Sequence, residues 1–160
     1  MYEDKDIEKI LLGKLITYPK EYIKHHANIS EDMFVNVTNI NIFNSYNKLQ
    51  SQGKAPDLVN LSKELKGTEQ FIDLTLSRMA NEDAFLPIEI ETCIVRLKQA
   101  QTSRNIFEFA KQLSIYIENL EDVDKIIKFI TEKSSNLDSN EVVKEQEIND
   151  QLSDVSTQMD

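Results

Sequence analysis

After Pro87 the sequence runs to its last residue, Asp160, without another glycine or proline. Tight turns depend on these two residues for their backbone angles, so few folds tolerate so long a stretch without them. Sandwiches and barrels of β-strands need such turns repeatedly, whereas long helices need none. The whole chain holds only three glycines and three prolines. The sequence therefore predicts an all-α fold.

Apolar residues in the first 98 positions recur at the three- and four-residue spacing of one helix face. This spacing predicts a first helix over 5–16, and a proline at its start favours a short second helix over 19–25. Ser30, followed by two acidic residues, is typical of a helix N-cap. Thr38 repeats the arrangement before a helix over 39–52. The side chains of that helix predicted to face the core are Ile42, Phe43, Tyr46 and Leu49.

Two glycines mark the ends of the middle helices. Gly53 supplies the left-handed residue that stops the preceding helix, and Gly67 ends a helix that Asp57 caps. Thr68 is predicted to cap the next helix. Its predicted buried positions are Phe71, Leu74 and Met79.

The segment 99–135 is predicted to form an antiparallel helical hairpin. The pattern from Pro87 fits either one long helix to about Glu118 or two helices with a kink. A turn over 118–122, with Asp122 as N-cap, leads to the second arm. Each arm has one apolar stripe: Ile106, Phe109, Ala110, Leu113 and Ile117 on the first, and Val123, Ile126, Ile127 and Ile130 on the second.

Three aromatic residues fall outside these stripes, namely Phe107, Tyr116 and Phe129. A hairpin of two helices has a single inner face, so spare aromatic side chains indicate burial against another surface. That surface is either the body of the domain or a second subunit, and the residues alone do not decide between them. These three residues are the candidate protein-interface residues.

The chain carries a formal net charge of −10, and much of it lies near the end. Residues 138–160 hold seven acidic side chains against one lysine. Binding to nucleic acid depends on clustered lysine and arginine, so we expect no direct DNA binding. The polar run over 134–140 suits a linker, and 136–160 is interpreted as an acidic linker.

Catalytic and cofactor chemistry is not indicated by any group of residues. The three glycines are too far apart for a phosphate-binding loop. His25 and His26 are adjacent, so on a helix they point about 100° apart and are poorly placed to share a metal. Cys93 lies in an apolar stretch and is interpreted as a buried apolar residue; as the only cysteine it excludes an internal disulfide. No apolar run is long enough to cross a membrane and the start does not resemble a secretion signal, so a cytoplasmic protein is expected.

Five segments, in order, resemble the N-terminal domain of DnaB-family replicative DNA helicases. In the opening segment an acid precedes an apolar pair, a glycine and further apolar residues, although the family usually has small or apolar residues in place of Lys9 and Lys14. The most similar segment has the family's glycine, proline, aspartate and apolar stretch. The five are 8–16 (EKILLGKLI), 29–34 (ISEDMF), 41–43 (NIF), 53–61 (GKAPDLVNL) and 90–104.

This resemblance implies a globular helical subdomain over 1–98, a protruding hairpin over 99–135, and a linker over 136–160 that leads toward an ATPase domain absent from this sequence. It implies a non-catalytic domain that forms a collar of paired subunits, up to a hexamer, and docks primase or a helicase loader. No cofactor is expected in this fragment, since ATP and magnesium belong to the motor of the full-length ATP-dependent helicase. The divergence suggests a phage or mobile element. The alternative is therefore a stand-alone adaptor or regulator that modulates a helicase.

Overall fold

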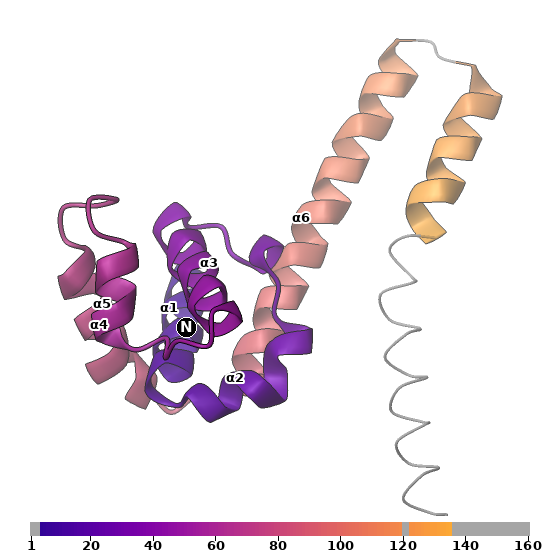
Figure 1. Ribbon diagram of the computed structural model, residues 1–160. Helices are drawn as coiled ribbons and strands as arrows, with labels where there is room; N and C mark the ends of the chain where they lie inside the picture. Colours follow the sequence, from indigo (N-terminus) through magenta and orange to yellow (C-terminus); the bar gives the residue numbers. More distant parts are fainter. Residues whose placement is uncertain (1–3, 120–121, 136–160) are drawn as a thin grey trace, which may run out of the picture. The chain divides into compact units, whose positions relative to one another are not determined.

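The computed structural model describes residues 4–119 and 122–135, and these residues form helices and turns but no strand (Figure 1). The predicted all-α fold is confirmed. The chain divides into two compact units, Met1–Gln101 and Thr102–Asp160, with the boundary inside helix α6. The helices are α1 (Asp4–Thr17), α2 (Pro19–His25), α3 (Val37–Ser51), α4 (Leu58–Glu64), α5 (Ile72–Asn81), α6 (Ile90–Glu118) and one further helix over 123–135.

Helix α1 is the centre of the first unit, and it contacts α2, α3, α5 and the 3₁₀ turn Asp83–Phe85. A helix with neighbours on several sides needs apolar residues around most of its circumference. Gly13 is part of this arrangement, because a Cβ there would lie 2.2 Å from the carbonyl oxygen of Met79 in α5. The side chains of α1 that form the core are Ile7, Ile10, Leu11, Leu12, Leu15 and Ile16.

Helix α3 buries the four side chains predicted for it, but it begins earlier than predicted. Its N-cap is Asn36, whose side-chain oxygen accepts a hydrogen bond from the amide of Asn39 at 3.2 Å. The predicted N-cap, Thr38, is wrong; its hydroxyl instead donates to Glu69. Ser30 does start a helical turn, but only the single 3₁₀ turn Glu31–Met33, because the backbone is extended again at the next residue.

Helix α5 presents a different face to the core than predicted. Met79 is buried, but Phe71 and Leu74 are 64% and 63% exposed. The buried positions are spaced at i, i+4, i+7 and i+8, and they are Ile72, Leu76, Met79 and Ala80. Thr68 does not cap this helix, because its hydroxyl donates to the Leu65 carbonyl at 2.7 Å and closes the end of α4 instead.

The other predicted helix signals agree with the structure. Asp57 caps α4 by accepting a hydrogen bond from the Asn60 amide at 2.9 Å. Gly53 and Gly67 have positive φ angles of 69° and 87°, the left-handed conformation expected after a helix. Of the two alternatives for the pattern from Pro87, the structure has the one long helix, α6, which runs from Ile90 to Glu118.

Candidate protein-interaction site

The second unit contains two helical arms, which are the end of α6 and the 123–135 helix. Aromatic rings hold them together. The ring centroids of Phe109 and Phe129 lie 5.5 Å apart in a stacked arrangement, and Tyr116 meets Phe129 edge-on at 4.8 Å. The side chain of Asp122 accepts a hydrogen bond from the Asp124 amide at 3.0 Å, which confirms it as the N-cap of the second arm. The two arms therefore make contact, as a hairpin requires.

The face that each arm turns to the other agrees only in part with the predicted stripes, because Phe109 belongs to the predicted stripe of α6 and Tyr116 does not. On α6 it includes Phe109 and Tyr116, which are seven residues apart and so lie on one helix face. The prediction that Tyr116 and Phe129 lie off the inner face is wrong, because both rings take part in the contact between the arms. Aromatic packing thus sets the facing sides of the two helices.

Several side chains of the predicted inner stripes are exposed in the structure. On the second arm the exposed members are spaced by four and three residues and are neighbours on one helix face, whereas on α6 Ile106 and Ile117 share a face but lie eleven residues apart. Exposed apolar side chains gathered in this way are typical of surfaces that bind another protein. We call this set the apolar flank of the hairpin; its members are Ile106, Ile117, Val123, Ile127 and Ile130.

The three candidate interface residues have different surroundings. Phe107 is 71% exposed and has no ring partner among the described residues. Tyr116 is 38% exposed, and Phe129 is half-buried beneath it. Of the three, Phe107 offers the most surface to a partner.

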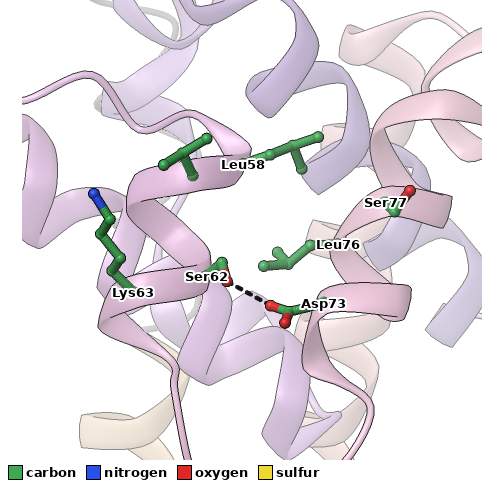
Figure 2. A pocket seen from close by; sticks show the side chains of 7 residues that line it. Leu58, Ser62, Lys63, Asp73, Leu76 and Ser77 are labelled. Atoms are coloured by element: carbon green, nitrogen blue, oxygen red, sulfur yellow. Dashed lines mark hydrogen bonds between the residues drawn. The ribbon is translucent and has the colours of Figure 1, made fainter.

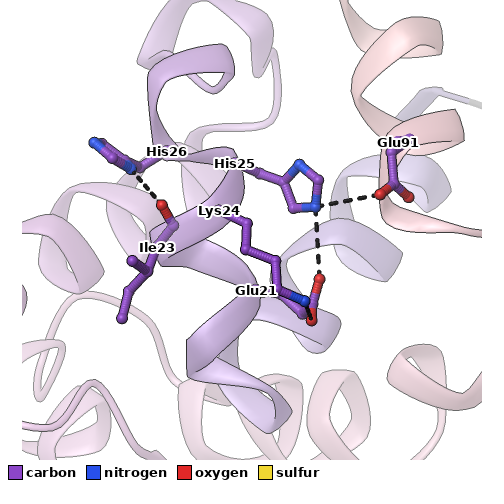
Figure 3. Close-up of polar contacts among 6 residues, drawn as sticks. All are labelled: Glu21, Ile23, Lys24, His25, His26 and Glu91. Atoms are coloured by element: carbon purple, nitrogen blue, oxygen red, sulfur yellow. Dashed lines mark hydrogen bonds and ion pairs between the residues drawn. The ribbon is translucent and has the colours of Figure 1, made fainter. Parts of the chain in front are cut away.

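A polar cluster in the first unit joins α2 to the first turn of α6 (Figure 3). The Nε2 atom of His25 lies 3.5 Å from a carboxylate oxygen of Glu21 and 3.3 Å from one of Glu91. A hydrogen bond from Lys24 to Glu21 lowers the pKa of that carboxyl group. His26 turns to a different partner, since its Nδ1 lies 2.9 Å from the Ile23 carbonyl oxygen. The cluster connects two helices.

Cys93, the only thiol, is fully buried, and burial raises its pKa to about 11. The prediction that it packs as an apolar residue is confirmed. Within residues 4–119 and 122–135, no group of three or more potential ligands is arranged to hold a metal ion. No helix in the same part of the chain is long and apolar enough to cross a membrane.

The sequence did not reveal the structural role of two charged residues of α1, Glu8 and Lys14, whose side chains bind backbone groups of neighbouring segments. Glu8 is 1% exposed and accepts hydrogen bonds from the Val35 amide at 2.7 Å and the Asn39 side chain at 2.7 Å. Lys14 donates to the carbonyls of Ala84 and Leu86 at 2.8 and 3.1 Å. A charged residue on the apolar side of a helix was the available signal, because burial of a charge requires such partners.

Taken together, the described residues form an all-α domain whose exposed apolar side chains are typical of a protein-binding module. The family model for the DnaB-like helicase N-terminal domain matches residues 1–114, and the chain belongs to this family. That domain is a non-catalytic part associated with replicative helicases. No curated protein matches the chain.

Proposed function

We propose that this chain is the assembly and docking domain of a replicative DNA helicase. In this role the hairpin pairs with the hairpin of a second subunit, and pairs associate further into a collar of up to six subunits. The domain also docks primase or a helicase loader, and it does not bind DNA directly.

The apolar flank of the hairpin is the observation that carries this proposal. Its side chains lie on both arms and lose contact with water only if another surface covers them. A second hairpin offers the same side chains in the same order, so one two-fold interface would bury both flanks at once. Phe107 adds an exposed aromatic ring, a residue type that is enriched at protein interfaces.

Self-association is tested by light scattering of the 160-residue chain over a wide range of concentrations. The wild type should form dimers or larger assemblies as its concentration rises. The double variant Ile117→Ser/Ile127→Ser should raise the dissociation constant by about tenfold or more, because it places hydroxyls in the proposed interface. Lys111→Ser, on an exposed residue of the same helix, is the matched control.

Circular dichroism should show that all three proteins keep the same helix content, which separates loss of pairing from unfolding. A wild type that stays monomeric at the highest concentration, with no affinity for the primase or loader of its own replication system, would contradict the proposal. Binding to such a partner that Phe107→Ser weakens at unchanged helicity would support the docking role.

A further inference from the structure

The apolar flank of the hairpin lies on one side of the two arms. On each arm the flank residues follow the ring-contacting residues by roughly a quarter of a turn around the helix, in the direction of the chain. Because the arms of a hairpin are antiparallel, the same rotation on both brings the two rows of apolar side chains to the same side. On α6 the row also includes Ala110 and Leu113, which lie between the two flank residues of that arm. The flank is therefore a single apolar face with a helix along each edge.

A third helix laid along this face would contact both rows at once, as in a small helical bundle. Such a helix needs an apolar row with the spacing of the rows that it meets. The row on α6 has the spacing i, i+4, i+7 and i+11, and the row on the second arm has i, i+4 and i+7; their members are Ile106, Ala110, Leu113 and Ile117 on α6 and Val123, Ile127 and Ile130 on the second arm.

The same spacing recurs in the segment 141–160, which lies outside the part of the chain that the structure describes. Asp150 and Asp154 fall on the opposite side of a helix drawn through this segment, so its sequence is amphipathic. The apolar row of the segment is Ile148, Leu152, Val155 and Met159.

The connection between the second arm and this segment has a suitable length. The second arm is described to Ser135, and the polar run then occupies the five residues 136–140. Helices that pack as antiparallel neighbours are commonly joined by about two to eight residues. Asn140, followed by the acidic Glu141, is typical of a helix N-cap. A helix that begins there can return along the second arm.

Covalent attachment favours this segment over any separate partner. A short connection gives a tethered segment an effective concentration of about a millimolar at its site, whereas a second chain reaches the same face only at its own concentration. The first unit offers no comparable match to an occupant in its hollow of about 320 Å³ between α4 and α5 (Figure 2). Lys63 and Asp73 both line that hollow, so its charges favour neither an acidic nor a basic ligand.

We propose that the segment 141–160 folds back as a third helix on the apolar flank, and that a second subunit must displace it in order to pair. The segment thereby limits assembly in the single chain. The contact itself depends only on the hairpin and the segment, whereas its effect on assembly rests on the proposed function.

The contact is tested on the 160-residue chain with a nitroxide spin label attached to Ser153→Cys, a position beside the apolar row. The native Cys93 is buried and is not labelled. At a concentration where light scattering gives the mass of the monomer, the label should broaden the amide signals of residues 106–117 and 123–130. The broadening should persist when the labelled chain is diluted into an excess of unlabelled chain, because both groups belong to one molecule. Ile148→Asp/Leu152→Asp should remove it.

The matched control is Gln146→Asp/Asn149→Asp, which adds the same charge to the same segment but away from the apolar row. It should keep the broadening. The effect on assembly is measured by light scattering across concentration. Ile148→Asp/Leu152→Asp should lower the apparent dissociation constant of self-association by about tenfold, the ratio expected if the flank is free in about one molecule in three and each pair needs two free flanks. The control should leave this constant unchanged.

Three results would overturn the proposal: no broadening of the hairpin signals, equal broadening in both double variants, or broadening that disappears on dilution with unlabelled chain. Equal dissociation constants of the wild type and Ile148→Asp/Leu152→Asp would refute the limit on assembly. The two proposals remain distinguishable. Broadening in a chain that never self-associates contradicts only the pairing of hairpins, and self-association without broadening in the monomer contradicts only the folded-back segment.

Discussion

Substitution of Gly13 by alanine tests the closest approach between α1 and α5. The added Cβ would lie 2.2 Å from the carbonyl oxygen of Met79, 2.9 Å from its carbonyl carbon and 3.1 Å from the amide nitrogen of Ala84. All three neighbours are backbone atoms, so no side chain can rotate away. Relief requires the two segments to move apart by about 1 Å, since non-bonded heavy atoms pack at roughly 3.5 Å.

Two effects of this substitution oppose each other. Alanine in place of glycine favours a helix by up to about 1 kcal/mol. Overpacking of a tight contact costs about 1–3 kcal/mol even where side chains can adjust, and the contact at Gly13 lies at or above the upper end because backbone meets backbone. The clash outweighs the gain. Gly13→Ala should lower the free energy of unfolding by about 2 kcal/mol and the melting temperature by roughly 5–10 °C.

Gly53 provides the control, because its φ of 69° is unfavourable for alanine but nothing lies within 4 Å of its Cβ position. Gly53→Ala should cost about 1 kcal/mol. The assay is urea denaturation followed by far-UV circular dichroism. If Gly13→Ala is as stable as the wild type, or more stable than Gly53→Ala, then α1 and α5 do not touch at Gly13 and the packing argument fails.

Three further predictions concern buried polar groups. Glu8→Gln should lower the free energy of unfolding by about 2 kcal/mol in urea denaturation, because an amide nitrogen then faces the donors that the carboxylate accepts; a loss under about 0.5 kcal/mol would mean that the charge is dispensable. Burial raises the pKa of Asp83, and its Oδ2 atom has no hydrogen-bond partner among the described residues. A raised pKa in the folded state means that stability falls as the pH rises through the carboxyl range, so Asp83→Asn should raise the melting temperature at pH 7 and not at pH 3. Equal shifts at both pH values would contradict this assignment. Cys93, buried and with a pKa of about 11, should react with a thiol reagent at pH 8 only when urea is added, and rapid labelling of the native chain would refute its burial.

The local sequence was sufficient to predict a helix boundary where a single residue determines the backbone conformation at that boundary. Gly53 and Asp57 act within one turn of their own position, and both ends were predicted correctly. The prediction of Thr38 as N-cap is wrong because Asn36, two residues earlier, can also accept a hydrogen bond. In addition, Glu8 of α1 accepts hydrogen bonds from the amides of Val35 and Asn36, just before the helix. Competition between two possible caps is settled by tertiary contacts, which the local sequence does not contain.

Helix faces were harder to predict than helix bounds. Helix α5 has two overlapping apolar series, and contact with α1 and α4 selects the one that begins at Ile72 over the one that includes Phe71 and Leu74. Periodicity gives both series similar weight, because each repeats at three or four residues. Only the neighbouring helices distinguish them.

The hairpin extends this reasoning to function. The two arms meet through Phe109, Tyr116 and Phe129, and aromatic rings bury a large area at few positions. Ile117 and Ile127, which the sequence pattern predicts on the inner face, remain exposed. Substitutions of the aromatic and of the aliphatic side chains should therefore have different effects. Loss of Phe129 should open the arms, whereas loss of Ile117 and Ile127 should leave the arms closed and remove only the surface available to a second subunit.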